Sequence, residues 1–307
     1  MTQQLDYALV QDAAARIAGR VRPVAVAPAG PGTWFALEHL QHTGSFKARG
    51  ARNFLAAHRE AGGLPAAGVT IASGGNAGLA CAWAARAEGI PATVFLPETA
   101  PAVKVKRLAS YGAEVRLHGS GYAEAVEACR AHAADSGALL SHAYDHPLVA
   151  AGAGTLLDEI RAALPELDAV VVSVGGGGLF AGVAAAARAH GVRVVAVEPE
   201  NCRSLHAALE ADRPVDVAVS SVAADALGAS RVSADALAAA KDPGVTPVLV
   251  PDEAVVRARL ALWEEHRLVV EHAAATAWAA VAGSPGVHGE RTAVVLCGAN
   301  TDPADLS

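Results

Sequence analysis

The most informative stretch of this chain runs Ala169-Val170-Val171-Val172-Ser173-Val174-Gly175-Gly176-Gly177-Gly178-Leu179-Phe180. A continuous apolar run that ends in glycines is typical of a strand buried on both faces, and the Ala-rich residues up to Ala189 favour a helix after it. Four consecutive glycines let backbone N–H groups approach an anion closely at the start of that helix. The stretch therefore predicts a strand, a phosphate-binding turn and a helix.

Units of the same kind occupy most of the chain. After a polar helix near residues 7–20, short apolar runs alternate with helical stretches, which predicts parallel sheets with helices on both faces, an α/β fold. A first group has strands expected at 69–71, 92–96 and 113–117, with helices at 76–88, 101–111 and 122–135. A second group has strands expected at 169–174, 192–197, 246–250 and 292–297.

Composition excludes several classes of function. The chain has 307 residues, a net charge of −7 and a mean hydropathy of +0.30, so it is long enough for one large or two modest domains. No basic cluster suits nucleic acid or an anionic membrane, and the two long uncharged stretches, 61–85 and 169–187, are interrupted by glycines. With no secretory signal and four scattered cysteines, we expect a cytoplasmic enzyme.

Lysine is rare here, which makes each lysine informative. Lys104, Lys106 and Lys241 lie in stretches that we expect to be exposed. Lys47 instead follows Phe46 at the start of a helix, where the helix N-terminus and an apolar neighbour disfavour the ammonium form. A neutral amine suits a Schiff-base nucleophile, although a solvent-exposed lysine at a helix start is the alternative.

Two further segments carry polar groups at the end of an expected strand. Ser73-Gly74-Gly75-Asn76-Ala77-Gly78 forms a glycine turn whose N–H groups can hold a carboxylate or phosphate, and Asn76 adds both a donor and an acceptor. An ordinary turn capped by Asn76 would look the same. Cys297 follows the last expected strand, where it is either a core residue or part of a site. The twelve histidines form no HxH pair, and we expect no histidine metal site.

A dinucleotide site is a competing interpretation of the glycine run. Gly176-x-Gly178-x-x-Ala181 satisfies the dinucleotide fingerprint with alanine last, and Glu198 ends the next expected strand. Glu198 would then bind a ribose in an NAD-dependent oxidoreductase. That interpretation gives neither Lys47 nor the 73–78 turn a role.

Taken together, four segments resemble the serine/threonine dehydratases, or threonine ammonia-lyases, of the fold-type II (tryptophan synthase β-like) pyridoxal-phosphate enzymes. The segments are 43–51, 73–78, 173–179 and 297–300, and their order and approximate spacing agree with the family over nearly the whole chain. The resemblance implies a two-lobed fold. Residues 1–44 and 145–307 would form a large cofactor-binding domain, and residues 45–144 a small inserted α/β domain.

The resemblance also implies a role for each motif residue. Lys47 would form the Schiff base with pyridoxal phosphate, Phe46 would pack on the pyridine ring, Asn76 would bond the phenolic oxygen and Cys297 would face the pyridine nitrogen. The cofactor phosphate would lie on the backbone N–H groups of Gly175, Gly176, Gly177, Gly178 and Leu179. The substrate carboxylate would bind to Ser73, Gly74, Gly75, Asn76 and Ala77. A monovalent cation, K⁺ or Na⁺, would be held by Glu198 and by backbone carbonyls near Gly175, Cys202, Leu227 and Ala229.

The reaction that the resemblance implies is α,β-elimination of water from L-threonine and/or L-serine, giving 2-oxobutyrate or pyruvate plus ammonia. A thiol such as Cys297 does not keep the pyridine nitrogen protonated as a carboxylate would, which favours elimination over transamination. An amino-acid racemase or a β-replacement enzyme on the same cofactor is the alternative, and Gly74, where serine racemases tend to have a serine, argues against racemisation. The family further implies a homodimer, and because nothing follows Ser307 we expect no isoleucine-binding regulatory domain and a catabolic role.

Overall fold

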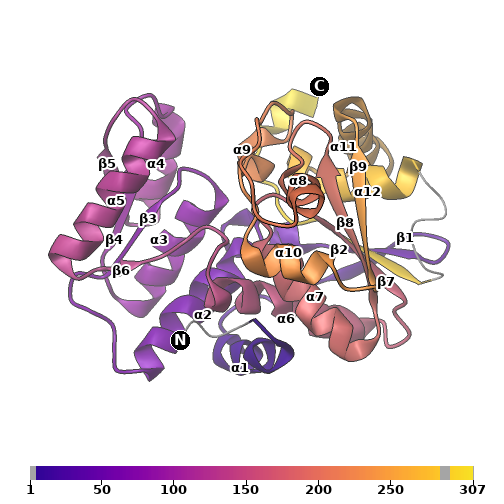
Figure 1. Ribbon diagram of the computed structural model, residues 1–307, viewed down its shortest axis with the longest axis horizontal. Helices are drawn as coiled ribbons and strands as arrows, with labels where there is room; N and C mark the ends of the chain where they lie inside the picture. Colours follow the sequence, from indigo (N-terminus) through magenta and orange to yellow (C-terminus); the bar gives the residue numbers. More distant parts are fainter. Residues whose placement is uncertain (1–4, 284–290, 307) are drawn as a thin grey trace.

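Two sheets, each covered by helices, organise the chain in the computed structural model, which describes residues 5–283 and 291–306 (Figure 1). We call the part around the four-stranded sheet the small lobe and the part around the six-stranded sheet the large lobe. The α/β class, with parallel-sheet cores and helices on both faces, is confirmed. No helix in the described ranges combines the length and the apolar character needed to cross a membrane.

The larger sheet is parallel except at one edge, where β1 pairs antiparallel with β2. Its strands, in spatial order, are β1 (Val26–Gly30), β2 (Thr33–Ala36), β10 (Thr292–Val295), β7 (Ala169–Ser173), β8 (Arg193–Pro199) and β9 (Val245–Val250). The central strand β7 is buried along its whole length, as its valine run predicts. The principal hydrophobic core of the protein surrounds this strand.

Helices cover both faces of the larger sheet. The helices of this lobe are α1 (Tyr7–Ile17), α6 (Pro147–Ala163), α7 (Gly178–His190), α8 (Ser204–Ala211), α9 (Ala224–Leu227), α10 (Ala234–Ala240), α11 (Asp252–His266) and α12 (His272–Gly283). Helix α12 packs directly on the central strands and is backed by α11, while α7 packs on β7 and β8 and is backed by α6 and α1. Three short 3₁₀ turns, Glu38–Leu40, His42–Gly44 and Pro303–Leu306, complete the regular structure of the described residues.

The smaller sheet is wholly parallel. Its strands, in spatial order, are β5 (Glu114–Leu117), β4 (Ala92–Leu96), β3 (Val69–Ala72) and β6 (Leu139–Leu140). Its helices are α2 (Lys47–Glu60), α3 (Asn76–Glu88), α4 (Ala102–Ser110) and α5 (Tyr122–Ser136). Every strand of this sheet lies within residues 45–144 and every strand of the other lies outside that range, but where each domain begins and ends stays a prediction.

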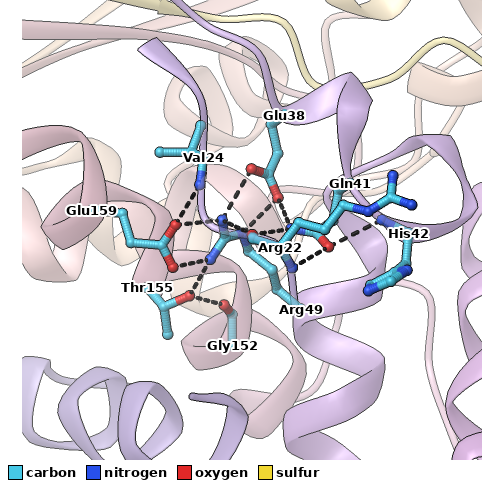
Figure 2. A network of polar contacts seen from close by, with 9 residues as sticks. All are labelled: Arg22, Val24, Glu38, Gln41, His42, Arg49, Gly152, Thr155 and Glu159. Atoms are coloured by element: carbon cyan, nitrogen blue, oxygen red, sulfur yellow. Dashed lines mark hydrogen bonds and ion pairs between the residues drawn. The ribbon is translucent and has the colours of Figure 1, made fainter. Parts of the chain in front are cut away.

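Helix α2 connects the two lobes, because it contacts α3 of the small lobe and both α1 and α6 of the large lobe. A buried ion network fixes its first turn (Figure 2). The Arg49 guanidinium donates to Glu38 at 2.5 Å and to the two carboxylate oxygens of Glu159 at 2.7 and 2.8 Å. Its Nη1 also donates to the Thr155 hydroxyl at 3.1 Å. Because Arg49 lies two residues after Lys47, the network anchors the segment that carries Lys47 to α6.

Most expected elements occur within one or two residues of their predicted bounds, and the expected helix at 76–88 has those bounds. The main corrections concern short elements. The hairpin of β1 and β2 was not expected, since Pro28, Gly30, Pro31 and Gly32 suggest a loop. The expected strand at 292–297 ends at Val295, and the two-residue strand β6 adds a fourth strand to the small lobe.

Candidate active site

A pocket of about 460 Å³ is lined by residues of both lobes. The turns that follow β3, β7 and β10 reach it, together with the first residues of α2. Parallel strands that end at one edge commonly bring their following loops to a shared ligand site. The glycine turn, Lys47, Asn76 and Cys297, which are far apart in the sequence, therefore meet in one cavity.

Lys47 is the first residue of α2 and lines the pocket. The amine donates to the Ala143 carbonyl at 2.7 Å and lies 4.7 Å from the centre of the Phe46 ring. Burial lowers the pKa of Lys47 to about 8, against the smaller opposing effects of Cys297 and Glu271. About a tenth of this amine is thus uncharged at pH 7, hundreds of times the neutral fraction of a lysine with the ordinary pKa, as suits a nucleophile or base.

The glycine turn between β7 and α7 has no room for side chains. A Cβ on Gly176 would lie 2.3 Å from the Tyr144 ring, and Gly177 has a φ of +93°, in the left-handed region. Helix α7 begins at Gly178, so the N–H groups of its first turn have no acceptor within the helix. Backbone donors at a helix N-terminus facing a pocket form a suitable cradle for a phosphate.

The turn after β3 carries Asn76, the first residue of α3, at the pocket wall. The helix is capped by Gly75 and not by Asn76, so the Asn76 side chain is available for other contacts. Its Nδ2 donates to the two carboxylate oxygens of Glu271 at 2.9 and 3.1 Å, and its Oδ1 accepts from Asn300 at 2.5 Å. The N–H groups at this helix start suit a small carboxylate.

Cys297 lies two residues beyond β10, with its thiol 3.5 Å from the Ser173 hydroxyl. The side chain is buried but lines the pocket. Burial, with a further contribution from Glu271, raises the pKa of Cys297 to about 12, so the thiol stays neutral. A neutral thiol lacks the negative charge that a thiolate offers a metal ion and that a carboxylate would offer a cationic group.

The pocket brings together all the residues that the sequence predicted for cofactor and substrate. They are Phe46, Lys47, Ser73, Gly74, Gly75, Asn76, Ala77, Gly175, Gly176, Gly177, Gly178, Leu179 and Cys297. Leu227 and Ala229 also line it, whereas Glu198 and Cys202 lie outside it. The individual role of each residue is not settled by this placement and stays a prediction.

Several pocket residues were missed by sequence reasoning. Glu271 is a buried carboxyl next to Asn76, and a lone glutamate after apolar residues gives no motif to find it by. Lys104, expected to be an exposed surface charge, lines the pocket and forms an ion pair with Asp225 of the large lobe. Its position as the third residue of α4 could not be related to the pocket without knowing where α4 packs. Tyr144 also lines the pocket, against the glycine turn.

Comparisons with known proteins agree with this geometry. Residues 22–298 match the family model described as pyridoxal-phosphate dependent enzyme. The chain belongs to this family. An L-threonine ammonia-lyase of Geobacter sulfurreducens is 37% identical over 99% of this chain and 77% of that protein. A phenylserine dehydratase of Ralstonia pickettii is 37% identical over 90% of this chain and 86% of that protein. The structure of maize serine racemase superposes with a TM-score of 0.91 at 28% identity, covering 99% of this chain and 96% of that one.

The pocket of this pyridoxal-phosphate enzyme fits its cofactor by three independent features. A cradle of four glycines, which a Cβ on Gly176 would obstruct, suits the phosphate. A buried amine of lowered pKa, on Lys47, suits the aldehyde, and the Phe46 ring beside it suits the face of the pyridine. The dinucleotide interpretation of the same glycines is not supported, because the Glu198 carboxylate is occupied by hydrogen bonds from Leu205 and His206.

The residues expected to hold a monovalent cation lie beside the pocket of this pyridoxal-phosphate enzyme. Glu198 is fully buried, and the backbones at Gly175 and Leu227 are in close contact. Among the described residues, His206 is the one ionisable side chain that bonds this buried carboxylate, which fits a neighbouring cation. The Gly175 carbonyl, however, accepts a hydrogen bond from the Ser204 hydroxyl at 3.0 Å, so it has only one lone pair left for such an ion.

Proposed function

We propose that this chain is a dehydratase of small β-hydroxy amino acids, which eliminates water from L-threonine and/or L-serine and yields 2-oxobutyrate or pyruvate plus ammonia. The observation that carries the proposal is a single pocket in which the buried Lys47 amine, the tetraglycine turn and the neutral Cys297 thiol meet. The named relatives, an L-threonine ammonia-lyase and a phenylserine dehydratase, support the same class of reaction.

Pyridoxal phosphate, when bound, supplies the electron sink for cleavage of the Cα–H bond and loss of the β-hydroxyl. The chain supplies orientation and proton transfer. Lys47 Nζ takes the Cα proton, a role that its pKa of about 8 supports, because a base is most effective when its pKa is near the working pH. The N–H groups of the 73–77 turn hold the substrate carboxylate, which fixes the Cα proton relative to Lys47.

Cys297 favours elimination over reactions that need a strongly electron-withdrawing pyridinium. Its pKa of about 12 leaves the thiol uncharged, so it does not stabilise a protonated pyridine nitrogen as a carboxylate would. Carbanionic charge at Cα is then stabilised less, and expulsion of the β-hydroxyl competes better with reprotonation.

Racemisation is the second candidate, because maize serine racemase shares the fold at 28% identity. Gly74 argues against it as the main activity, since glycine provides no proton donor at this position. The space there is also limited: a Cβ on Gly74 would lie 2.9 Å from the Leu96 Cδ2 methyl group. A Gly74→Ser variant that gains measurable D-serine formation would support this reasoning, and abundant D-serine formation by the unaltered enzyme would overturn it.

The first experiment measures 2-oxoacid release from L-serine, L-threonine and L-threo-phenylserine by the purified protein with pyridoxal phosphate. In parallel, borohydride reduction followed by peptide mass spectrometry locates any pyridoxyl group. We expect oxoacid release and a pyridoxyl group on Lys47, and Lys47→Ala should lose both. A modified Lys47 without oxoacid release would keep the cofactor and refute the dehydratase, whereas dehydratase activity in Lys47→Ala would refute the role of Lys47.

Four finer features are part of this proposal. A monovalent cation near Glu198 predicts higher activity in K⁺ or Na⁺ than in tetramethylammonium, and equal activity would contradict it. A homodimer predicts twice the monomer mass in light scattering. The cytoplasmic location and catabolic role are tested by cell fractionation and by growth of a deletion strain on threonine or serine as nitrogen source.

A further inference from the structure

The Asn76 side chain belongs to a line of hydrogen bonds that the reaction described above leaves unexplained. On one side its Nδ2 donates to both Glu271 oxygens, and on the other its Oδ1 accepts from Asn300 Nδ2. Asn300 follows β10 in the large lobe, Glu271 precedes α12, and Asn76 begins α3 of the small lobe. The line therefore crosses from one lobe to the other at the pocket wall.

Asn300 is fixed by two further segments. Its Nδ2 also donates to the Thr43 carbonyl at 2.8 Å, in the turn that precedes Lys47. Its Oδ1 accepts a hydrogen bond from Arg107 on α4. The turn at Gly44 packs closely on the Asn300 amide, because a Cβ on Gly44 would lie 2.8 Å from Asn300 Oδ1. With both ends of its amide in use, Asn300 has a single orientation.

Glu271 is fixed in the same way. Its side chain is buried, and a Cβ on Gly298 would lie 2.3 Å from its Oε1, so the carboxyl packs directly on the backbone of the turn beyond Cys297. Burial raises the pKa of Glu271, while hydrogen bonds from Asn76 and from the Asn300 backbone act in the opposite direction. A buried carboxyl is costly unless its oxygens accept hydrogen bonds, so Glu271 holds the donor side of Asn76 in place.

These contacts leave one N–H group of the Asn76 amide for a ligand in the pocket. A primary amide has one oxygen and two N–H groups. Asn300 determines where the Asn76 oxygen lies, and Glu271 occupies one N–H, which leaves one N–H in a defined direction. Without these two partners the amide could rotate and present its oxygen, an acceptor, to the pocket instead.

We propose that Glu271 and Asn300 are positioning residues, which hold the Asn76 amide so that its remaining N–H donates to the phenolic oxygen of pyridoxal phosphate. The inference rests on the proposed function, since it requires the cofactor to bind with that oxygen at Asn76. It adds two residues to the site and gives each a definite partner.

The test is a double-mutant cycle read by cofactor binding. Apoprotein is titrated with pyridoxal phosphate, and the dissociation constant and the absorption maximum of the bound cofactor are recorded for Glu271→Gln, Asn300→Asp, Asn76→Ala and the double variants. Each single change is expected to weaken binding by about tenfold, the scale of one buried hydrogen bond, and to shift the absorption maximum. In the Asn76→Ala background, Glu271→Gln is expected to change both quantities much less than in the unaltered protein, because the amide that it positions is absent and only its electrostatic effect on Lys47 and Cys297 is left.

The controls separate positioning from folding. Glu127→Gln, on the exposed face of α5, should leave affinity and spectrum unchanged, and thermal unfolding of each apoprotein reports its stability. Asn300→Asp keeps the acceptor for Arg107 and replaces the amide donor by a carboxylate oxygen, which cannot donate to Asn76. Independent, multiplying effects of Glu271→Gln and Asn76→Ala, or weaker binding with an unshifted spectrum, would overturn the inference. Failure of the unaltered protein to bind pyridoxal phosphate at Lys47 would instead overturn the proposed function.

Discussion

At the scale of single residues, burial sets the chemistry of the pocket. Removing a group from water disfavours its charged form, so the same cause lowers the pKa of Lys47 to about 8 and raises that of Cys297 to about 12. Both side chains are therefore uncharged over a range of mildly alkaline pH. With ordinary pKa values, the Lys47 amine would be a weaker nucleophile and base, and the Cys297 thiol would be partly charged at the same pH.

The first prediction follows from the sign of the Lys47 shift. The free amine, not the ammonium ion, reacts with an aldehyde, so attachment of pyridoxal phosphate to the apoprotein should accelerate by about tenfold per pH unit below the pKa and level off above it. With a pKa of about 8, the plateau should begin near pH 8, instead of near the ordinary value of 10.5. Stopped-flow absorbance measures this rate, and a rate that still rises steeply between pH 9 and 10 would contradict the shift.

The second prediction concerns the glycine turn. Gly176→Ala places a methyl group 2.3 Å from the Tyr144 ring, which forces the phosphate cradle to move. Pyridoxal phosphate should bind about tenfold or more weakly, because one misplaced charge-assisted hydrogen bond costs on the order of 1.5–3 kcal/mol. Gly30→Ala, where a Cβ meets nothing within 4 Å, is the matched control and should bind normally. Equal affinities for the two variants would show that this turn does not hold the cofactor.

At the scale of elements, regular units were predictable from local signals and their junctions were not. Helix α3 has its expected bounds because it begins after a Gly-Gly pair and is followed by Gly89, which has a left-handed φ of +70°. The hairpin of β1 and β2 was hidden by prolines and glycines that are tolerated only at a sheet edge. Strand β6 has only two residues, too few for any periodicity.

The residues of the candidate site also fall into two groups, those that a local sequence signal identifies and those that only tertiary contacts identify. Motif residues on turns after strands, such as Asn76 and Gly176, were found because glycine next to a strand end is a local signal. Glu271 and Lys104 were not, because their importance comes from what packs against them. Glu271 contacts Asn76, which is 195 residues distant in sequence, and Lys104 contacts Asp225 across the pocket. A single sequence contains no direct record of such pairs.

The third prediction tests the ion network that anchors α2. Arg49 and Glu38 are fully buried, so Arg49→Met leaves a carboxylate without its partner in the interior. Breaking a buried pair from one side costs about 3–5 kcal/mol, which urea unfolding should show. Arg231→Met, which removes an exposed pair with Asp216, should leave the urea midpoint unchanged. A stability of Arg49→Met similar to that of Arg231→Met would mean that the network does not anchor the helix.

At the scale of the whole molecule, α4 links the two lobes across the pocket. Lys104 pairs with Asp225 on α9, and one turn later Arg107 donates to Asn300 beyond β10. Both partners belong to the large lobe, and Lys104 and Asp225 both line the pocket. Because these side chains are partly exposed, the links are weak individually and suit lobes that separate to admit substrate.

The fourth prediction applies to this contact. Lys104→Gln removes the ion pair with Asp225 but keeps a long side chain in the pocket wall. KM should therefore rise by up to about fivefold, the range of an exposed ion pair. High salt should reduce the difference between the variant and the unaltered enzyme, because screening weakens the pair in the latter. Lys106→Gln, a change on the same helix outside the pocket lining, is the control and should change neither quantity. A KM unaffected by Lys104→Gln would exclude a role of this pair in holding the lobes together.

The fifth prediction follows from the position of the cofactor pocket between the lobes. A ligand that binds only the folded state stabilises it by about 2.7 kcal/mol at a concentration one hundred times its dissociation constant. Because Lys47, Asn76 and the glycine turn come from both lobes, pyridoxal phosphate should raise the melting temperature of both lobes together.

Tryptophan fluorescence can report on each lobe. Trp83 lies in the small lobe, and the other tryptophans lie in the large lobe: Trp34, Trp263 and Trp278. Melting curves of the unaltered protein and of Trp83→Phe, followed by fluorescence, should therefore shift equally with the cofactor, and Lys47→Ala should show a much smaller shift. A shift confined to the tryptophans of the large lobe would mean that the small lobe contributes little to binding, and would remove Asn76 from the cofactor site.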